Sequence, residues 1–128
     1  MKSIYRFAVW SNVFYLIPFA FALQTQFWVD AIAIALLFVA STAYHASGER
    51  KFATFDVLVS ACVIVLNSVM VYLGARPLGL LFVIGVLLAI GLCIRYSLEQ
   101  GDRGSVAHGW WHVVAAALLT ACVLASVG

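Results

Sequence analysis

Five long apolar stretches follow one another along the chain with only a few polar residues between them. Each is close to the roughly 20 residues that an α-helix needs to cross a lipid bilayer. They cover residues 4–23, 28–46, 53–73, 78–97 and 107–127. Because these stretches fill most of the 128 residues, we expect a single integral membrane domain, residues 1–128, without a separate soluble domain.

The composition supports a membrane-embedded fold. Hydrophobic residues make up 66% of the chain and charged residues 9%, whereas a soluble domain is roughly half apolar and about a quarter charged. The short polar breaks make consecutive helices antiparallel neighbours. The sequence therefore predicts an all-α polytopic bundle of five transmembrane helices with up-down topology.

The first stretch admits a second interpretation. Lys2 and Arg6 precede an apolar run that ends in small residues at 20–22, which is the pattern of a cleaved secretory signal. Polar or helix-disturbing residues interrupt this run, namely Ser11, Asn12, Tyr15 and Pro18. We therefore expect the stretch to be kept as the first transmembrane helix.

The basic residues predict an orientation. In an up-down bundle of five helices, the amino terminus shares one side with the second and fourth connections. That side carries six of the seven basic residues, which are Lys2, Arg6, Arg50, Lys51, Arg95 and Arg103. The positive-inside rule then places the amino terminus in the cytoplasm and the carboxyl terminus outside. No basic cluster of the kind that binds nucleic acid is present in the sequence.

Four ionisable residues lie at helix ends on this same predicted cytoplasmic side. His45 is near the end of the second stretch, Asp56 near the start of the third, and His108 and His112 at the start of the fifth. Ionisable groups in apolar helices are costly, so they are candidates for a functional site. Their gathering on one side strengthens that interpretation.

Spacing predicts the chemistry of this site. Ser41 and His45 are four residues apart, as are His108 and His112, so each pair shares one helix face. Three histidines are a common ligand set of catalytic zinc, which keeps its fourth position for water. We therefore expect His45, His108 and His112 to bind zinc, Asp56 to transfer the proton of the attacking water, and Ser41 to hydrogen-bond that water or a substrate oxygen.

The remaining polar and sulfur-containing residues have structural interpretations. Asn67 is expected to form an interhelical hydrogen bond, as are Ser11, Asn12 and Tyr15. Asp30 is expected at a helix start or an interface on the other side of the membrane. The odd number of cysteines argues against a disulfide framework. Small buried thiols are instead expected at Cys62, Cys93 and Cys122.

The pattern Ser41-x-x-x-His45, Asp56, His108-Gly-Trp-Trp-His112 resembles the motif set of the CREST superfamily. This superfamily joins alkaline ceramidases, adiponectin and progestin receptors, membrane lipid-remodelling proteins and the myomaker group. The resemblance covers residues 41–116 and implies a zinc-dependent hydrolase of lipid amides or esters, ceramidase-like or phospholipase-like. The superfamily is typically seven-helical, so the shorter chain implies a homodimer that completes the lipid-binding cavity.

Two alternatives remain open from the sequence. Two histidines on facing helices also suit a b-type haem in an electron-transfer module, although Asp56 and Ser41 then have no task. Alternatively, zinc closes a structural site with Asp56 as a fourth ligand, in a receptor, fusion or assembly protein. An interfacial histidine pair beside headgroups explains His108 and His112 alone, but not their meeting with His45 and Asp56.

Overall fold

The computed structural model describes residues 3–74, Gly85 and residues 104–127, with side chains described within 7–49, 51–73 and 109–126. This part of the chain is helical and has no strand. Its elements are α1 (Ser3–Ser11), the 3₁₀ helix η1 (Asn12–Tyr15), α2 (Leu16–Gln24), α3 (Trp28–Ser47), α4 (Arg50–Gly74) and α6 (Gly104–Val127). The predicted all-α class is therefore confirmed for the described residues.

Within the described residues, four segments are long and apolar enough to cross a membrane. They are Phe7–Gln24, Trp28–Ser47, Lys51–Leu73 and Gly109–Ser126. They correspond to the first, second, third and fifth predicted stretches. The predicted stretch 78–97 lies outside the described residues except for Gly85, so the number of five helices stays a prediction.

The first span is not one continuous α-helix as predicted, because η1 separates α1 from α2. Pro18 near the start of α2 provides the physical reason. Proline has no N–H to donate, and its ring crowds the carbonyl group four residues earlier, which here is that of Phe14 within η1. The tightened turn keeps the span helical and leaves Tyr15 and Ala22 in the core.

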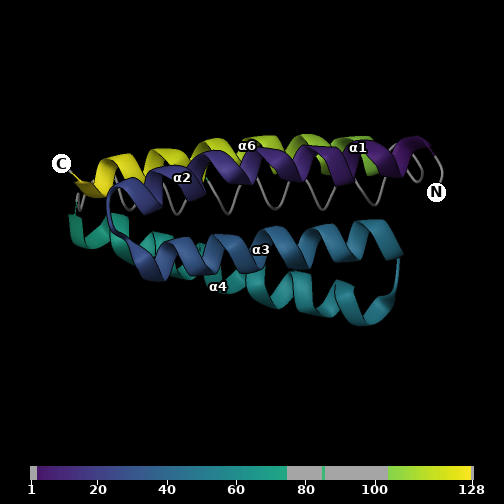
Figure 1. Ribbon diagram of the computed structural model, residues 1–128, viewed down its shortest axis with the longest axis horizontal. Coiled ribbons are helices and arrows are strands. Elements are labelled where there is room, and N and C mark those ends of the chain that lie inside the picture. The colour runs from purple at the N-terminus through teal and green to yellow at the C-terminus, as the bar shows by residue number, and fades with distance from the viewer. Residues whose placement is uncertain (1–2, 75–84, 86–103, 128) are drawn as a thin grey trace.

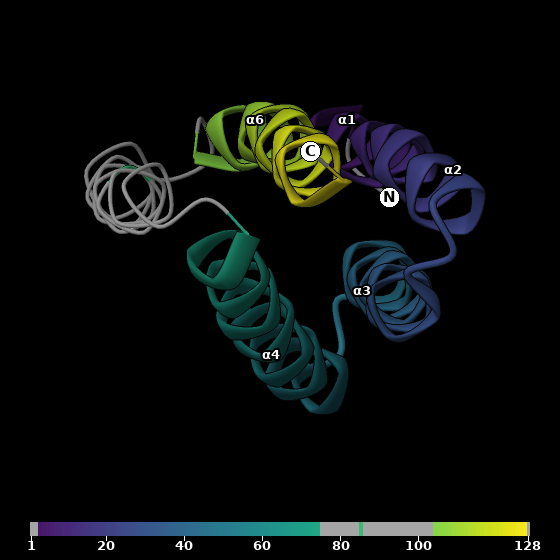
Figure 2. The ribbon, with the colours of Figure 1, turned by 90° about the vertical axis from the view of Figure 1, so that its left-hand side faces the viewer.

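The helices form an up-down bundle in which the first and last described helices are neighbours (Figure 1). The end-on view shows α3 between α4 and the α1–α2 span, with α6 beside that span on its other side (Figure 2). The amino terminus, the α3–α4 connection and the start of α6 lie at one end of the bundle, hereafter the N-terminal end (Figure 1). The carboxyl terminus and the α2–α3 connection lie at the other.

The α3–α4 connection is shorter than the predicted break at residues 47–51. Gly48 ends α3 with a left-handed backbone, at φ 69°, and its N–H donates to the carbonyl of Tyr44. Glycine suits such a helix end because it has no Cβ to clash. Arg50 and Lys51, both good helix formers, already belong to α4.

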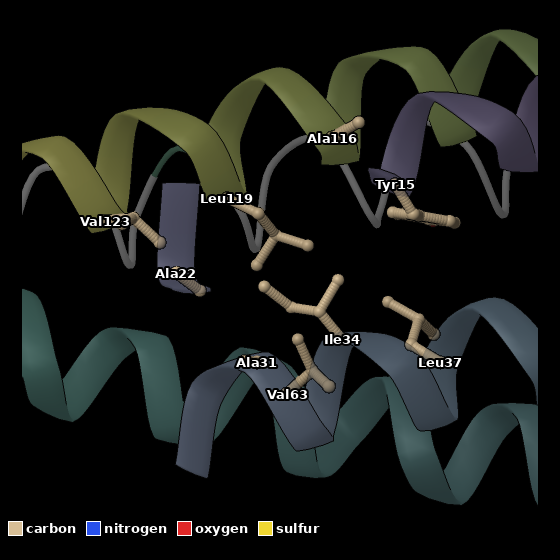
Figure 3. Close-up of a cluster of buried hydrophobic side chains, with 9 residues drawn as sticks. All are labelled: Tyr15, Ala22, Ala31, Ile34, Leu37, Val63, Ala116, Leu119 and Val123. Atoms are coloured by element: carbon tan, nitrogen blue, oxygen red, sulfur yellow. The ribbon is translucent and has the colours of Figure 1, made fainter. Parts of the chain in front are cut away.

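A cluster of buried apolar side chains joins all four spans along the bundle axis (Figure 3). Small residues take part at Ala22, Ala31 and Ala116, and they let neighbouring helices approach closely. Larger side chains fill the space between them, among them Ile34 from α3 and Leu119 from α6 (Figure 3).

The prediction of buried thiols is half right. Cys122 of α6 is buried, but Cys62 of α4 is exposed. The face of α4 that points inward carries Val63 and Asn67, which leaves Cys62 on the outer face, where an apolar thiol suits lipid contact. Cys93 lies outside the described residues.

Candidate active site

Residues predicted from the sequence meet inside the N-terminal end of the bundle. Ser41 of α3, Asp56 of α4 and His112 of α6 are all buried, with relative exposures of 1%, 7% and 2%. His45 of α3 is partly buried. We call Ser41, His45, Asp56 and His112 the polar cluster. The predicted convergence from three different helices is present in the fold.

The two described histidines are in direct contact across the bundle. The ring centroids of His45 and His112 are 5.0 Å apart, with the ring planes at 59°. The ring of Tyr44 lies 4.7 Å from that of His45, and the ring of Tyr15 lies 5.8 Å from that of His112. The aromatic neighbours restrict how far either imidazole can turn.

Ser41 connects a histidine with the carboxyl group. Its hydroxyl oxygen is 3.4 Å from Nε2 of His112, and the Ser41 hydroxyl also interacts with the carboxyl group of Asp56. The Oδ1 atom of Asp56 is buried and has no hydrogen-bond partner among the described residues. A buried carboxylate oxygen that has no described hydrogen-bond partner is available to a cation or a water molecule.

The opposite edge of His112 faces α1. Its Nδ1 atom is 2.9 Å from the Ser11 hydroxyl oxygen and 3.1 Å from the Ala8 carbonyl oxygen. Metal-binding histidines generally hold their second ring nitrogen against a carbonyl or another acceptor in this way. The interhelical hydrogen bond predicted for Ser11 is therefore present, and its partner is one of the predicted zinc ligands.

Ser11 is also the contributor that the sequence alone did not assign to the site. Its position in the sequence could have indicated this role. Ser11 is the first polar residue after Arg6 in the apolar run, and it lies toward the end of the span that shares a side with His112. The neighbouring Asn12 is buried, yet its amide forms no hydrogen bond with a described residue. The interhelical hydrogen bond predicted for Asn12 is therefore not found among the described residues.

The predicted ligand His108 belongs to α6, one turn before His112, but its side chain lies outside the described part. Across the side chains that are described, no group of three or more His, Cys, Asp or Glu residues forms a ready metal-binding set. The described members of the predicted set are thus His45 and His112, and Asp56 is linked to His112 through Ser41.

Two deeper polar residues form a separate pair. Asp30 occupies the first turn of α3 as predicted, and it is buried in the bundle, with 1% exposure. Nδ2 of Asn67 donates to its Oδ1 atom over 2.8 Å, which confirms the interhelical bond predicted for Asn67. The pair lies toward the other end of the bundle and does not belong to the polar cluster.

Comparison of the chain with known protein families, with curated proteins and with solved structures gave no match.

Proposed function

We propose that this protein is a zinc-dependent integral membrane hydrolase that cleaves an acyl amide or acyl ester bond of a lipid. The observation that carries this proposal is the meeting of two imidazoles, a buried carboxyl group and a hydroxyl group from three helices at one end of an apolar bundle. Buried groups of this kind are costly in a membrane, which is why such a cluster points to function.

The residues present suit zinc in two respects. His112 holds its Nδ1 edge against acceptors of α1 and turns its Nε2 edge toward Ser41 and the cluster interior. The Oδ1 atom of Asp56, which is buried and has no described hydrogen-bond partner, adds a carboxylate oxygen to the same region. In this proposal His45, His112 and His108 hold the metal, because borderline-soft zinc favours imidazole nitrogen.

When bound, zinc supplies Lewis acidity, which polarises a carbonyl group and makes water easier to deprotonate. Asp56 takes the proton from the attacking water and returns it to the leaving amine or alcohol as the acyl C–N or C–O bond breaks. Ser41 donates a hydrogen bond to the oxygen that becomes negative during the attack. The products are a fatty acid and the lipid backbone.

A small cavity next to Tyr15 supports a lipid substrate, because its lining is mostly apolar, with Ser60 and Asn67 as the polar exceptions. Tyr15, whose ring contacts His112, lines the cavity together with Trp111 and Leu119. The cavity volume is about 40 Å³. It offers apolar contact to the part of an acyl chain next to the carbonyl, and in this proposal a homodimer provides the rest of the wall.

The proposed placement follows the basic residues. The amino terminus faces the cytoplasm, and the zinc site lies near the cytoplasmic surface. Exposed aromatic residues are found near both ends of the described spans, at Trp110 toward one and at Trp28 and Tyr72 toward the other, as is usual at membrane interfaces.

Haem receives less support from the geometry. The rings of His45 and His112 touch each other, so this pair leaves no space for a porphyrin between the imidazoles. The other candidate pair, His45 with His108, lies partly outside the described side chains. In a haem site, Asp56 and Ser41 would also have no role.

The test begins with metal analysis of protein purified in mild detergent. We expect about one zinc ion per chain, lost in His45→Ala, His108→Ala and His112→Ala variants but kept in Ser68→Ala. Ser68 is a suitable control because, among the described residues, its hydroxyl bonds only to the carbonyl of Ile64 in its own helix, at 2.7 Å. Stoichiometric zinc in all three histidine variants would refute the site.

Activity is then measured on ceramides and phospholipids that carry a fluorescent acyl chain. Release of fatty acid that stops when zinc is removed and returns when it is added supports a hydrolase. If zinc is bound by four protein ligands, Asp56 included, and no substrate is cleaved, the metal is structural and the hydrolase proposal fails.

A further inference from the structure

Helix α1 presents two oxygen atoms to one edge of the His112 ring. The Ser11 hydroxyl oxygen lies 2.9 Å from Nδ1, and the Ala8 carbonyl oxygen lies 3.1 Å from the same nitrogen. Ser11 and Ala8 are one helical turn apart, and the Ser11 hydroxyl is itself 3.0 Å from the Ala8 carbonyl. The three atoms form a closed triangle between α1 and α6.

The protons in this triangle can be assigned from the chemistry of its members. The Ala8 carbonyl can only accept a hydrogen bond. The Ser11 hydroxyl donates its one proton to that carbonyl, so it meets His112 with its lone pairs. Both oxygens therefore act as acceptors toward Nδ1, and only an Nδ1 atom that carries hydrogen satisfies them.

The same assignment fixes the other nitrogen. A neutral imidazole carries one N–H, so a proton on Nδ1 leaves Nε2 as the lone-pair nitrogen. Nε2 faces the Ser41 hydroxyl at 3.4 Å, on the side of the polar cluster. A nitrogen in this state accepts a hydrogen bond or binds a metal ion, whereas the opposite tautomer does neither on that side.

We propose that Ser11, with the Ala8 carbonyl, is a positioning residue that fixes His112 as the Nδ1–H tautomer and directs its Nε2 lone pair into the polar cluster. The consequence for zinc rests on the function proposed above, but the tautomer itself does not. Partners of this kind around metal-binding histidines typically change metal affinity by about 10- to 100-fold.

A purely structural role for Ser11 makes a different prediction. If the hydroxyl only joined α1 to α6, its removal would lower stability and leave the tautomer of His112 unchanged. Nearby aromatic contacts hold the ring in place, since Tyr15 packs against His112 at 5.8 Å. The state of the two nitrogens therefore reports on Ser11 separately from packing.

The deciding experiment is nitrogen NMR of full-length protein labelled with ¹⁵N-histidine, in detergent and freed of metal. The His112 signals are identified by their loss in a His112→Gln variant. We expect wild-type protein to show a predominant Nδ1–H form. Ser11→Ala removes the shorter of the two contacts, so the Nδ1–H signal should shift and the Nε2–H form should appear. Ser11→Thr, which restores a hydroxyl, should return the wild-type spectrum.

Ser68→Ala is the matched control, because it removes a serine hydroxyl that bonds back to its own helix, and it should leave the His112 signals unchanged. Zinc titration of the same samples should show binding about 10-fold weaker in Ser11→Ala than in Ser68→Ala. A predominant Nε2–H form in wild-type protein, or identical His112 signals in wild type and Ser11→Ala, would overturn the proposal. Absence of zinc binding in wild type would refute the proposed function and leave the tautomer result to stand.

Discussion

Asn67 of α4 and Asp30 of α3 are joined by a hydrogen bond of 2.8 Å deep in the bundle. The same amide nitrogen also donates to the carbonyl of Val63 over 3.0 Å. Since a carbonyl only accepts, this second bond fixes which way the amide points. Both side chains are buried, and Asp30 thus depends on Asn67 for a donor.

Replacing Asn67 by Leu should therefore destabilise the protein by about 1–3 kcal/mol, because Asp30 stays buried without its donor. The double variant Asp30→Leu/Asn67→Leu should be more stable than Asn67→Leu alone, since it removes both polar groups. Thermal unfolding in detergent measures both. A double variant no more stable than Asn67→Leu alone would contradict this explanation.

Gly109 sets how closely α6 approaches α1. A Cβ atom at this position would overlap Cδ1 of the Phe7 ring, and the Phe7 ring is already packed against Trp110 at 5.6 Å. Gly109→Ala should cost about 1–3 kcal/mol, since the ring must move. Phe7→Ala combined with Gly109→Ala should recover part of the loss. Unfolding measurements on the two single variants and the double variant test this, and an unaffected Gly109→Ala would contradict it.

Gly48 controls the turn from α3 to α4. Its φ of 69° disfavours any residue with a Cβ, although nothing lies within 4 Å of the position where that atom would be. The effect of substitution is therefore backbone strain alone, and Gly48→Ala should lower stability by about 1 kcal/mol. Gly48→Asn should lose less, because asparagine tolerates this conformation. A larger loss for Asn than for Ala would contradict this explanation.

Asp56 should be required for turnover but not for folding. Asp56→Asn keeps the shape of the side chain and removes its ability to accept a proton. If the proposed mechanism holds, hydrolysis should fall by about 100-fold or more, while zinc content and melting temperature stay near wild type. Loss of zinc together with activity would instead make Asp56 a metal ligand.

Much of the cluster can be predicted from alternation alone. Short connections reverse the chain at each crossing, so the end of the second span and the starts of the third and fifth must share a side. That logic brings His45, Asp56 and His112 to one end of the bundle, as the fold confirms. It does not say which helices are lateral neighbours, and so it could not place α1 against α6.

Asp30 shows a second limit. Its burial follows from how α3 is rotated about its own axis, which hydrophobicity leaves undetermined when every face is apolar. In the structure Asp30, Ile34, Leu37 and Ser41 form one buried stripe, with the spacing of three and four residues typical of a helix face. Ser41 and Asp30 lie on the same buried stripe of α3. Extending the stripe from Ser41 toward the start of the helix would therefore have predicted that Asp30 is buried.

The triangle between α1 and α6 also bears on how the protein is made. The Ser11 hydroxyl and Nδ1 of His112 are separated by 101 positions in the sequence, and α6 leaves the ribosome after every other described helix. A nascent chain that has inserted only α1 to α4 already contains Ser11, Ser41 and Asp56, with no imidazole from α6 to meet them. The site is therefore completed only when α6 inserts, and a chain that has inserted no further than α4 holds these polar side chains in the bilayer without their partner on α6.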